Sequence, residues 1–309
     1  MHTTDITGSI VLYNNKFDEV KKVIESFLNC SLIKKLYVID NSETDILRER
    51  LSAINAEYIF TGKNLGYGAG HNIAIKKAIG VSKYHLILNP DIHFTPQTLT
   101  GLFRFMEHNT DVGLVMPKVL YRNGDLQYVC KKLPTPADLF ARRFIPGVVK
   151  PFLKNFLDSY EFKNKNYDTM MHVPHITGCF MFIRTKLFPI AGLFDEQFFL
   201  YLEDTDLCRR INEYALTVYY PHEQITHGFV RGSNKNLRLF LIHLNSSIKY
   251  FNKWGWFNDK MRVLVNNSLA DNSFNRNAAD WATAAKLTSQ ELRGKRRNSE
   301  AITTDSYAE

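Results

Sequence analysis

Short apolar runs rich in β-branched residues alternate with helical patterns through the first third of this chain. Residues 6–13, 35–40, 57–62 and 83–89 have the length and composition of buried strands. A helical pattern over residues 17–29 separates the first two of them. Strands that alternate with helices pack as a mostly parallel, doubly wound sheet with helices on both faces. The sequence therefore predicts an α/β fold.

A polar residue lies at or just beyond the end of each of these strands. In open α/β sheets, ligands bind in the crevice outside the carboxyl ends of the strands. We therefore expect these polar side chains to lie along one functional edge. They are Asn14, Asp40, Asn64 and Asp91.

Further elements are expected beyond residue 90. Residues 95–109 form a helical pattern that opens on Thr-Pro, a favoured helix start. Residues 112–121, 175–185 and 216–221 have the pattern of strands, and residues 235–254 carry apolar side chains at helical spacing. The sheet should therefore continue into the second half of the chain, followed by a C-terminal helical extension to about residue 257.

We expect one domain over residues 1–265 and a polar tail over residues 266–309. The tail is rich in Asn, Ala, Ser and Thr, which favours partial disorder. Residues 133–170 interrupt the sheet pattern with prolines, large aromatic residues and basic residues. This excursion has two interpretations, a lid or substrate-side loop and a plain surface insertion, and the sequence favours neither.

The chain has 309 residues, of which 45% are hydrophobic, so it can bury a large core without a disulfide or a structural metal. Its four cysteines include no CxxC pair, and we interpret them as reduced, buried thiols of a cytosolic protein. The first residues do not resemble a signal peptide, and no apolar stretch reaches the ~18 residues of a membrane span. We therefore expect a cytoplasmic protein.

The net charge of +8 and the pI of about 9.1 leave three classes of partner: nucleic acid, an anionic membrane surface and phosphorylated small molecules. The basic residues are scattered in pairs, and the chain has no nucleic-acid-binding motif of the usual kinds. The charge therefore favours phosphates and anionic lipid over nucleic acid. Peripheral contact with the inner face of the cytoplasmic membrane is one expectation, and a solvated basic face is its alternative.

The segment Asn89-Pro90-Asp91 ends the last of the four early strands. Pro90 fixes the turn and biases Asn89 toward an extended conformation. Asp91 is then presented at the carboxyl end of the strand, where a carboxylate can hold a divalent cation against a diphosphate. The alternative is an Asp that only caps the turn before the next helix.

Five acidic residues lie within twelve positions of an otherwise basic chain. Glu203 and Asp204 are expected at a helix N-terminus, where the helix dipole favours the ionised form and a carboxylate can accept a proton at neutral pH. The alternative is a helix cap together with an Asp206–Arg210 ion pair one turn apart. We interpret Asp206 as part of that pair and Asp204 as functional. The five acids are Asp195, Glu196, Glu203, Asp204 and Asp206.

His227 follows a strand and precedes glycines and Arg231, which suits a metal ligand and a phosphate contact. A lone histidine is more often structural, so this assignment depends on the company of Asp91. The HxxH spacing of His172 and His175 is weak evidence of a site away from a helix.

A glycine-rich turn, NLGYGAGHN, precedes a helical pattern. Its spacing is GxGxG and it follows the third strand, which argues against the dinucleotide fingerprint of an NAD enzyme. The glycines would still allow the backbone to approach a ligand, and the helix N-terminus behind them favours an anion.

Together these segments resemble glycosyltransferase family 2, the inverting enzymes with the GT-A fold. Within that family they are most similar to bacterial rhamnosyltransferases of surface-polysaccharide assembly, such as O-antigen and lipopolysaccharide biosynthesis. The resemblance covers roughly residues 6–255, and the order of seven matching segments makes it specific. The segments are SIVLYNN, VIDNS, NLGYGAGHN, LNPDI, TGCFMFIR, FDEQFFLYLEDTDLCRR and HGFVRGS.

The resemblance implies a role for each candidate residue. Asp204, the second acid of its ED pair, would be the catalytic base, with Glu203 and Gly178 on the acceptor side. Asp91, in the place of the last acid of the DxD motif of the family, and His227 would bind a divalent metal, Mg²⁺ or Mn²⁺. The residues implied in donor or nucleotide binding are Tyr13, Asn14, Asp40, Asn64, Gly66, Gly68, Asn72, Asn89 and Arg231.

One residue departs from the pattern of the family. Asn89 stands where the DxD motif has its first acid. An asparagine can still hydrogen-bond ribose or a metal-bound water, but the site loses one negative charge. The identity of the metal therefore stays open.

By resemblance, the chain would transfer a sugar from a nucleotide sugar to a hydroxyl of a growing, lipid-linked polysaccharide. dTDP-L-rhamnose is the first donor expected, and UDP-galactofuranose or another UDP-hexose is next. A metal would neutralise the leaving diphosphate, and a single carboxylate base without a carboxylate nucleophile predicts inversion.

Two other functions are alternatives to sugar transfer on this fold. A non-catalytic glycan-binding protein stays open as the alternative. A nucleotidyltransferase would need a basic phosphate loop near the first strand, which the segment SIVLYNN lacks.

Overall fold

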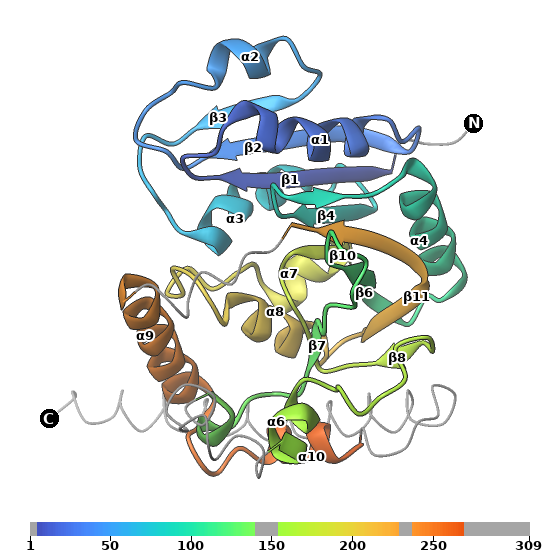
Figure 1. Ribbon diagram of the computed structural model, residues 1–309, viewed down its shortest axis with the longest axis vertical. Coiled ribbons are helices and arrows are strands. Elements are labelled where there is room, and N and C mark those ends of the chain that lie inside the picture. The colour runs from blue at the N-terminus through green and yellow to red at the C-terminus, as the bar shows by residue number, and fades with distance from the viewer. Residues whose placement is uncertain (1–4, 140–153, 229–236, 269–309) are drawn as a thin grey trace, which may run out of the picture.

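The computed structural model describes residues 5–139, 154–228 and 237–268. Nine strands form its central sheet. They are β1 (Ile6–Leu12), β2 (Ile33–Asp40), β3 (Glu57–Phe60), β4 (Tyr84–Leu88), β5 (Ile92–His93), β6 (Val112–Leu120), β8 (Met171–His172), β10 (Phe180–Arg184) and β11 (Leu216–His227). The strand order is β3-β2-β1-β4-β10-β6-β11-β5, with β8 paired to β11 (Figure 1).

The strands run mostly parallel. β1 pairs in parallel with both β2 and β4, and β6 pairs in parallel with β11. Only β10, among the longer strands, runs antiparallel to its neighbours β4 and β6. The predicted α/β sheet is therefore confirmed. Because β10 is antiparallel, its amino end lies at the same edge as the carboxyl ends of β1, β2 and β4.

Helices cover both faces of this sheet (Figure 1). Successive side chains of a strand point to opposite faces. Val38 of β2 belongs to the same buried cluster as Val23 in the first helix, whereas the adjacent Ile39 packs with Ala74 in the third. The described helices up to residue 211 are α1 (Phe17–Leu28), α2 (Arg48–Ser52), α3 (Tyr67–Ala78), α4 (Pro96–His108), α6 (Lys154–Tyr160), η1 (Thr185–Leu187, a 3₁₀ turn), α7 (Phe188–Ala191) and α8 (Glu203–Ile211).

The single strand expected over residues 175–185 is in fact two strands with a turn between them. β9 (His175–Ile176) pairs with β7 (Cys130–Lys131) in a separate two-stranded sheet, and β10 begins only at Phe180. The apolar run continues through the turn, so periodicity alone does not reveal the break. The turn lies at the functional edge because it precedes the antiparallel strand β10.

β11 is longer than the strand expected to end at residue 221. Its register with β6 shifts between Tyr220 and Gln224, and it then continues to His227. Such irregularities bend a strand, and β11 stays paired with β6 up to Thr226. The end of β11 pairs with β5, where His227 is opposite Ile92. This pairing brings His227 beside the turn that follows β4.

Two helices close the described part of the chain. α9 (Leu237–Trp254) agrees with the helix expected over residues 235–254, whereas α10 (Lys260–Ser268) was not expected. The side-chain amide of Asn266 hydrogen-bonds both the N–H and the carbonyl oxygen of Leu133, each at 2.9 Å. α10 therefore ties the C-terminal extension to the start of the excursion at residue 133.

Part of the chain lies outside the described residues. For the excursion over residues 133–170, this applies to residues 140–153. For the expected polar tail, it applies to residues 269–309. The proposed roles of both segments stay predictions.

Two expectations concern the rest of the chain. All four cysteines are free and buried, in agreement with the prediction of thiols. None of the helices in the described ranges combines the length and the apolar character that a membrane crossing requires.

Candidate active site

Asp91 and His227 lie side by side at the carboxyl edge of the sheet. Nε2 of His227 is 3.3 Å from Oδ1 of Asp91. The backbone N–H of Gly228 also donates to the carbonyl oxygen of Asp91 at 3.0 Å. Asn89 joins this pair, because its Nδ2 is 3.4 Å from Nε2 of His227. The structure thus brings together the three residues expected around a metal and a diphosphate.

Gln127 fixes the ring of His227. Its Oε1 is 3.0 Å from Nδ1 of His227, and its Nε2 donates to the carbonyl oxygen of His227 at 3.0 Å. Nδ1 therefore carries a proton toward Gln127, which leaves Nε2 to face Asp91. A carboxamide or carbonyl behind a histidine is a common way to fix the tautomer of a metal ligand.

The electrostatics of Asp91 and His227 are those of a coupled pair. Burial alone would lower the pKa of His227, but the Cys179 thiol and the Asp91 carboxylate beside it raise this pKa to about 10. Burial raises the pKa of Asp91, and the hydrogen bond and charge of His227 outweigh burial and hold it below its usual value. The pair therefore carries a proton between its side chains at neutral pH, in the place that a cation would take.

The donor set agrees with a divalent cation that is only partly held by protein. Asp91 and His227 offer one oxygen and one nitrogen, and Asn89 adds an amide. Among the described residues, no group of three or more His, Cys, Asp or Glu side chains could hold a metal ion. A cation here would need its other ligands from water and from a diphosphate, as Mg²⁺ does at many phosphate sites.

Asp204 lies in the first turn of α8, as predicted. Its Oδ2 accepts a hydrogen bond from the backbone N–H of Gly178 at 2.8 Å, and its Oδ1 accepts one from the N–H of Thr205 at 2.7 Å. Nε2 of His175 is 3.5 Å from the same Oδ2. α8 begins after two residues with positive φ, Tyr201 (71°) and Leu202 (68°), so the chain turns sharply into this helix.

The pKa values of the adjacent Glu203 and Asp204 carboxyls shift in opposite directions. Burial raises the pKa of Asp204, but the interactions with His175, Lys131 and the Gly178 N–H dominate and lower it to about 2. Burial and the charge of Asp204 raise the pKa of Glu203 well above its usual value. Glu203 is also 4% exposed, whereas the side chain of Asp204 is 18% exposed. Of these two neighbours, Asp204 is therefore the accessible carboxylate that is ionised at neutral pH.

Residues 178 and 179 connect the two halves of the site. Gly178 contacts Asp204, and the next carbonyl, that of Cys179, accepts a hydrogen bond from the Asn89 N–H at 2.9 Å. Tyr67 donates its hydroxyl proton to the carbonyl oxygen of Gly178 at 2.6 Å. The carboxylate of Asp204 and the Asp91 side of the site therefore lie on either side of one short turn.

Asp206 has a structural role, as the sequence predicted. Nε of Arg210 donates to its Oδ2 at 2.9 Å, one helical turn away. Trp254 and Lys253 of α9 bond to the other oxygen, each at 2.8 Å. The fully buried Asp206 therefore holds α9 against α8 and is not available to a substrate.

Asp40 lies at the end of β2 and its side chain is fully buried, and its expected contact with a nucleotide stays a prediction. Its oxygens accept hydrogen bonds from the Ser42 N–H at 2.9 Å and from the Tyr58 hydroxyl at 2.8 Å. Ser42 in turn accepts a bond from the N–H of Asn14 at 2.8 Å. Asn14 and Tyr13 are exposed at this edge, so Asp40 supports the loop that presents them.

The glycine-rich turn is explained by packing against protein. A Cβ on Gly66, whose φ is +91°, would lie 2.4 Å from the carbonyl oxygen of Phe199. A Cβ on Gly68 would lie 2.8 Å from Cβ of Phe194. The amide of the buried Asn72 bonds to both the N–H (3.0 Å) and the carbonyl oxygen (2.9 Å) of Phe194. The close neighbour that the sequence assigned to a ligand is therefore the segment before α8.

Two donor-side residues remain. Oδ1 of Asn64 accepts a hydrogen bond from the N–H of Gly66 at 3.0 Å, which shapes the start of α3. Arg231 lies outside the described residues, so its expected phosphate contact stays a prediction.

Sequence reasoning missed Gln127, Tyr67 and the role of His175. Nothing in the local sequence distinguishes Gln127, which reaches His227 from a different part of the chain. The HxxH spacing did point to His175, but the relevant partner is a carboxylate on α8 and not a second histidine.

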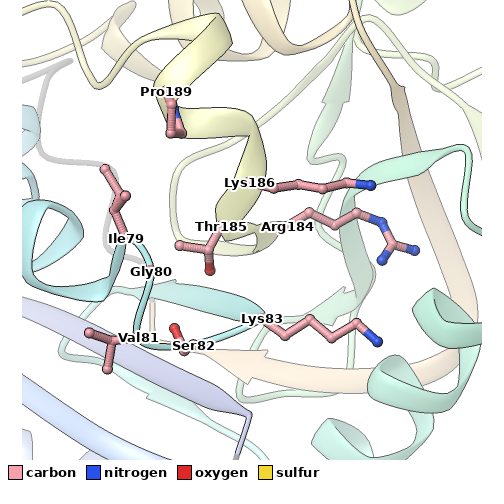
Figure 2. A pocket seen from close by; sticks show the side chains of 9 residues that line it. All are labelled: Ile79, Gly80, Val81, Ser82, Lys83, Arg184, Thr185, Lys186 and Pro189. Carbon is pink, nitrogen blue, oxygen red and sulfur yellow. The ribbon is translucent and has the colours of Figure 1, made fainter.

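A cavity of about 500 Å³ lies elsewhere in the molecule (Figure 2). It is lined by residues 79–83, which precede β4, and by residues that end or follow β10, including Arg184 and Lys186. Because β4 and β10 are antiparallel, both sets belong to the edge opposite Asp91. This cavity is therefore not part of the candidate active site.

Comparisons with known proteins identify the family. A family model described as Glycosyl transferase family 2 matches residues 9–189. The low-salt glycan biosynthesis hexosyltransferase Agl10 of Haloferax volcanii is 28% identical over 65% of this chain, and the match spans 60% of that relative's length. N-acetylglucosaminyl-diphospho-decaprenol L-rhamnosyltransferase of Mycobacterium tuberculosis is 23% identical over 70% of this chain and 74% of its own. Rhamnosyltransferase WbbL of Escherichia coli is 25% identical over 78% of this chain and 90% of its own length.

Solved structures share the fold. GalNAc-T7, crystallised with UDP, GalNAc and Mn²⁺, superposes with a TM-score of 0.60 at 13% identity, over 81% of this chain and 48% of its own. TarS of S. aureus gives a TM-score of 0.52 at 15% identity, over 88% of this chain and 44% of the TarS chain. At this level of identity the likeness extends to the architecture of the sheet and its helices.

Proposed function

This chain belongs to glycosyl transferase family 2, and we propose that it transfers a sugar, with inversion, from a nucleotide sugar to a hydroxyl of a glycan acceptor. The observation that carries this proposal is the pairing of two chemically different half-sites across residues 178–179. Asp91 and His227 form the half that suits a cation and a diphosphate. Asp204 forms the half that suits a proton acceptor.

Asp91 and His227 would hold a divalent cation, Mg²⁺ or Mn²⁺, which supplies positive charge to the departing diphosphate. Gln127 keeps the imidazole of His227 in the tautomer that such a ligand needs. Asn89 bears no charge and can hydrogen-bond the donor or a water. The exposed Tyr13 and Asn14, on the loop that Asp40 supports, would contact the base and the ribose.

Asp204 would accept the proton of the attacking hydroxyl. The hydrogen bonds from Gly178 and Thr205 keep the carboxylate ionised and fixed in direction. General-base assistance by such a group contributes typically about 10²–10⁴-fold in rate. Glu203 is buried, and its pKa is raised well above its usual value, so it does not suit the role of a carboxylate nucleophile. One available carboxylate favours a single displacement and hence inversion.

For the donor, we propose dTDP-L-rhamnose, with UDP-galactofuranose or another UDP-hexose as the alternative. Two of the relatives are named as rhamnosyltransferases, one from M. tuberculosis and one from E. coli. The name of the mycobacterial relative contains a diphospho-decaprenol acceptor. By analogy we propose a lipid-linked glycan as the acceptor of this chain.

A lipid-linked acceptor would place the protein at an anionic membrane surface, and one face of α9 supports this. Leu237, Leu241 and Ile248 recur at helical spacing and are 70%, 55% and 39% exposed. Phe257, after α9, is 80% exposed. Apolar side chains on a basic protein are typical of peripheral membrane contact.

Vesicle co-sedimentation tests this contact. Leu237→Gln together with Leu241→Gln should reduce binding to vesicles that contain anionic lipid, with little effect on folding because both residues are exposed. Val81→Gln, an exposed apolar residue in the cavity of Figure 2, is the matched control. Equal binding by both variants would contradict the contact.

Nucleotide release from a panel of sugar donors tests the proposed function. The purified protein is supplied with dTDP-L-rhamnose, UDP-galactofuranose and UDP-hexoses, each with Mg²⁺, Mn²⁺ or a chelator. We expect metal-dependent release, fastest with dTDP-L-rhamnose, and loss of release in Asp204→Asn. Asp18→Asn on the exposed face of α1 is the matched control. Release that is independent of Asp204 would exclude the proposed role of the base.

A further inference from the structure

His175 is a buried histidine whose polar contacts point at the base. It lies on β9 and is 3% exposed. Its Nε2 is 3.5 Å from Oδ2 of Asp204 and 3.3 Å from Oγ1 of Thr205. Both partners belong to the first turn of α8. The ring therefore contacts the turn of α8 that carries the Asp204 carboxylate.

The second ring nitrogen, Nδ1, makes no contact in the described ranges that would explain why residue 175 is a histidine. Among the residues that the structure describes, Nδ1 of His175 is buried and has no hydrogen-bond partner. Buried polar groups are nearly always paired, and leaving one unpaired has a cost. A residue that served only to fill this space would do so better as an apolar side chain. The polar groups that Nε2 of His175 does meet are the Asp204 carboxylate and the neighbouring Thr205 hydroxyl.

The local geometry makes His175 and Gly178 a two-point clamp. The Gly178 N–H, three residues after His175, donates to the same Oδ2 at 2.8 Å. The backbone between them leaves β9 and turns into β10. The ring and the amide thus approach one carboxylate oxygen from a single short segment. These two contacts hold Oδ2, and the Thr205 N–H holds the other oxygen, so together they fix the plane of the carboxylate.

We propose that His175 is a positioning residue for the base: its Nε2–H donates to Oδ2 of Asp204 and, with the Gly178 N–H, holds the carboxylate toward the acceptor hydroxyl. This inference rests on the proposed function of Asp204. It requires a proton on Nε2 of His175.

Other titratable groups face the same carboxylate. Lys131 on β7 is the cross-strand partner of His175, and it also favours the ionised form of Asp204. Glu203, Tyr67 and Cys208 lie close enough to interact electrostatically with Asp204. None of these three offers the carboxylate a hydrogen bond in the described contacts. Loss of His175 would therefore leave Asp204 with Lys131, with its backbone donors and with the Thr205 hydroxyl, which donates to the other oxygen, Oδ1, at 3.4 Å.

The glutamine and asparagine variants of His175 make a matched test. A glutamine side chain can place its amide N–H where Nε2 of the ring lies, whereas an asparagine amide reaches only the position of Nδ1. We expect His175→Gln to keep most of the wild-type kcat for nucleotide release in the presence of acceptor. His175→Asn and His175→Leu should lose about 10- to 100-fold in kcat, as is common when an orienting hydrogen-bond partner is removed.

Two readouts separate positioning from mere packing. The KM for the donor and the dependence on Mn²⁺ concentration should stay unchanged, because the Asp91 half of the site keeps all its contacts. The acid limb of the kcat–pH profile should move to higher pH in the Asn and Leu variants and not in the Gln variant. His172→Gln, in the same segment, is the control and should leave the profile in place.

The outcomes distinguish this inference from the function on which it rests. If Asp204→Asn keeps normal turnover, the proposed base is wrong whatever His175 does. If Asp204→Asn is inactive while the Gln and Asn variants of His175 have equal kcat and pH profiles, only the clamp is overturned. Should the Leu variant not fold, the Gln and Asn pair still decides.

Discussion

The backbone N–H of Gly178 donates a 2.8 Å hydrogen bond to Oδ2 of Asp204, and this contact links the central sheet to the first turn of α8. It exists because β10 is antiparallel: the turn before β10 then emerges at the edge where the parallel strands end. The same turn contacts the segment that carries Asn89. One short loop thus sets the distance between the two halves of the site.

A side chain at residue 178 should disturb the site more than the fold. In Gly178→Ala, the new Cβ would lie 3.3 Å from both Cβ of Asp204 and Cε1 of Tyr67, so one of them must move by a few tenths of an ångström. We expect kcat to fall by about 10-fold, since orientation of a catalytic group is sensitive to small displacements. The thermal midpoint should change little, and a large drop in it with normal kcat would contradict this explanation.

Metal affinity should depend on Asp91 and much less on Asn89. Asp91→Asn removes the charged oxygen ligand beside His227, whereas Asn89→Ala removes only an amide. We expect the Mn²⁺ dissociation constant, measured by isothermal titration with UDP or dTDP present, to rise at least about 10-fold in the first variant. Equal affinities in the two variants would contradict the assignment of Asp91.

Stability without metal should depend on pH through His227. Its folded-state pKa of about 10 lies above its ordinary value of 6.5. The stabilisation by its contact with Asp91 is therefore fully present between pH 3.8, the ordinary pKa of the Asp91 carboxyl, and pH 6.5, and it is lost as the pH rises toward 10. Urea unfolding in chelator should show the wild type losing its advantage over Asp91→Asn across this window. A constant difference between the two proteins would contradict the coupling.

The buried pair Arg209–Asp259 should stabilise the C-terminal helices. Both side chains are 3% exposed, and the two nitrogens of Arg209 donate to the two oxygens of Asp259 at 2.6 and 2.7 Å. Asp259→Ala leaves a buried guanidinium without its partner, which typically costs about 3–5 kcal/mol. We expect that loss in the free energy of unfolding from urea titration. A change below about 1 kcal/mol would contradict the pairing.

Much of the sheet and the central part of the site could be predicted from the sequence. The early strands have clear apolar runs, and polar residues at strand ends share an edge by topology, which is why Asp91 was expected beside a site. The start of α8 at Glu203 follows from its local pattern. The pairing of Asp206 with Arg210 was predictable because both lie on one helix.

The remaining features depend on contacts between distant parts of the chain. A glycine shows only that space is needed, and at Gly66 the space is used by Phe199 and not by a ligand. The burial of Asp40 depends on Tyr58, which is supplied by the next strand. The reach of β11 to His227 depends on a register shift that no periodicity predicts.

Turnover of Asp204→Asn tests the central claim most directly. Nucleotide release is measured at neutral pH with a saturating donor, Mn²⁺ and acceptor, beside the wild type and Asp18→Asn. If Asp204 is the base, its variant should fold normally, bind donor and metal as the wild type does, and lose about 10²–10⁴-fold in kcat. A folded Asp204→Asn protein with near-normal kcat would contradict the account.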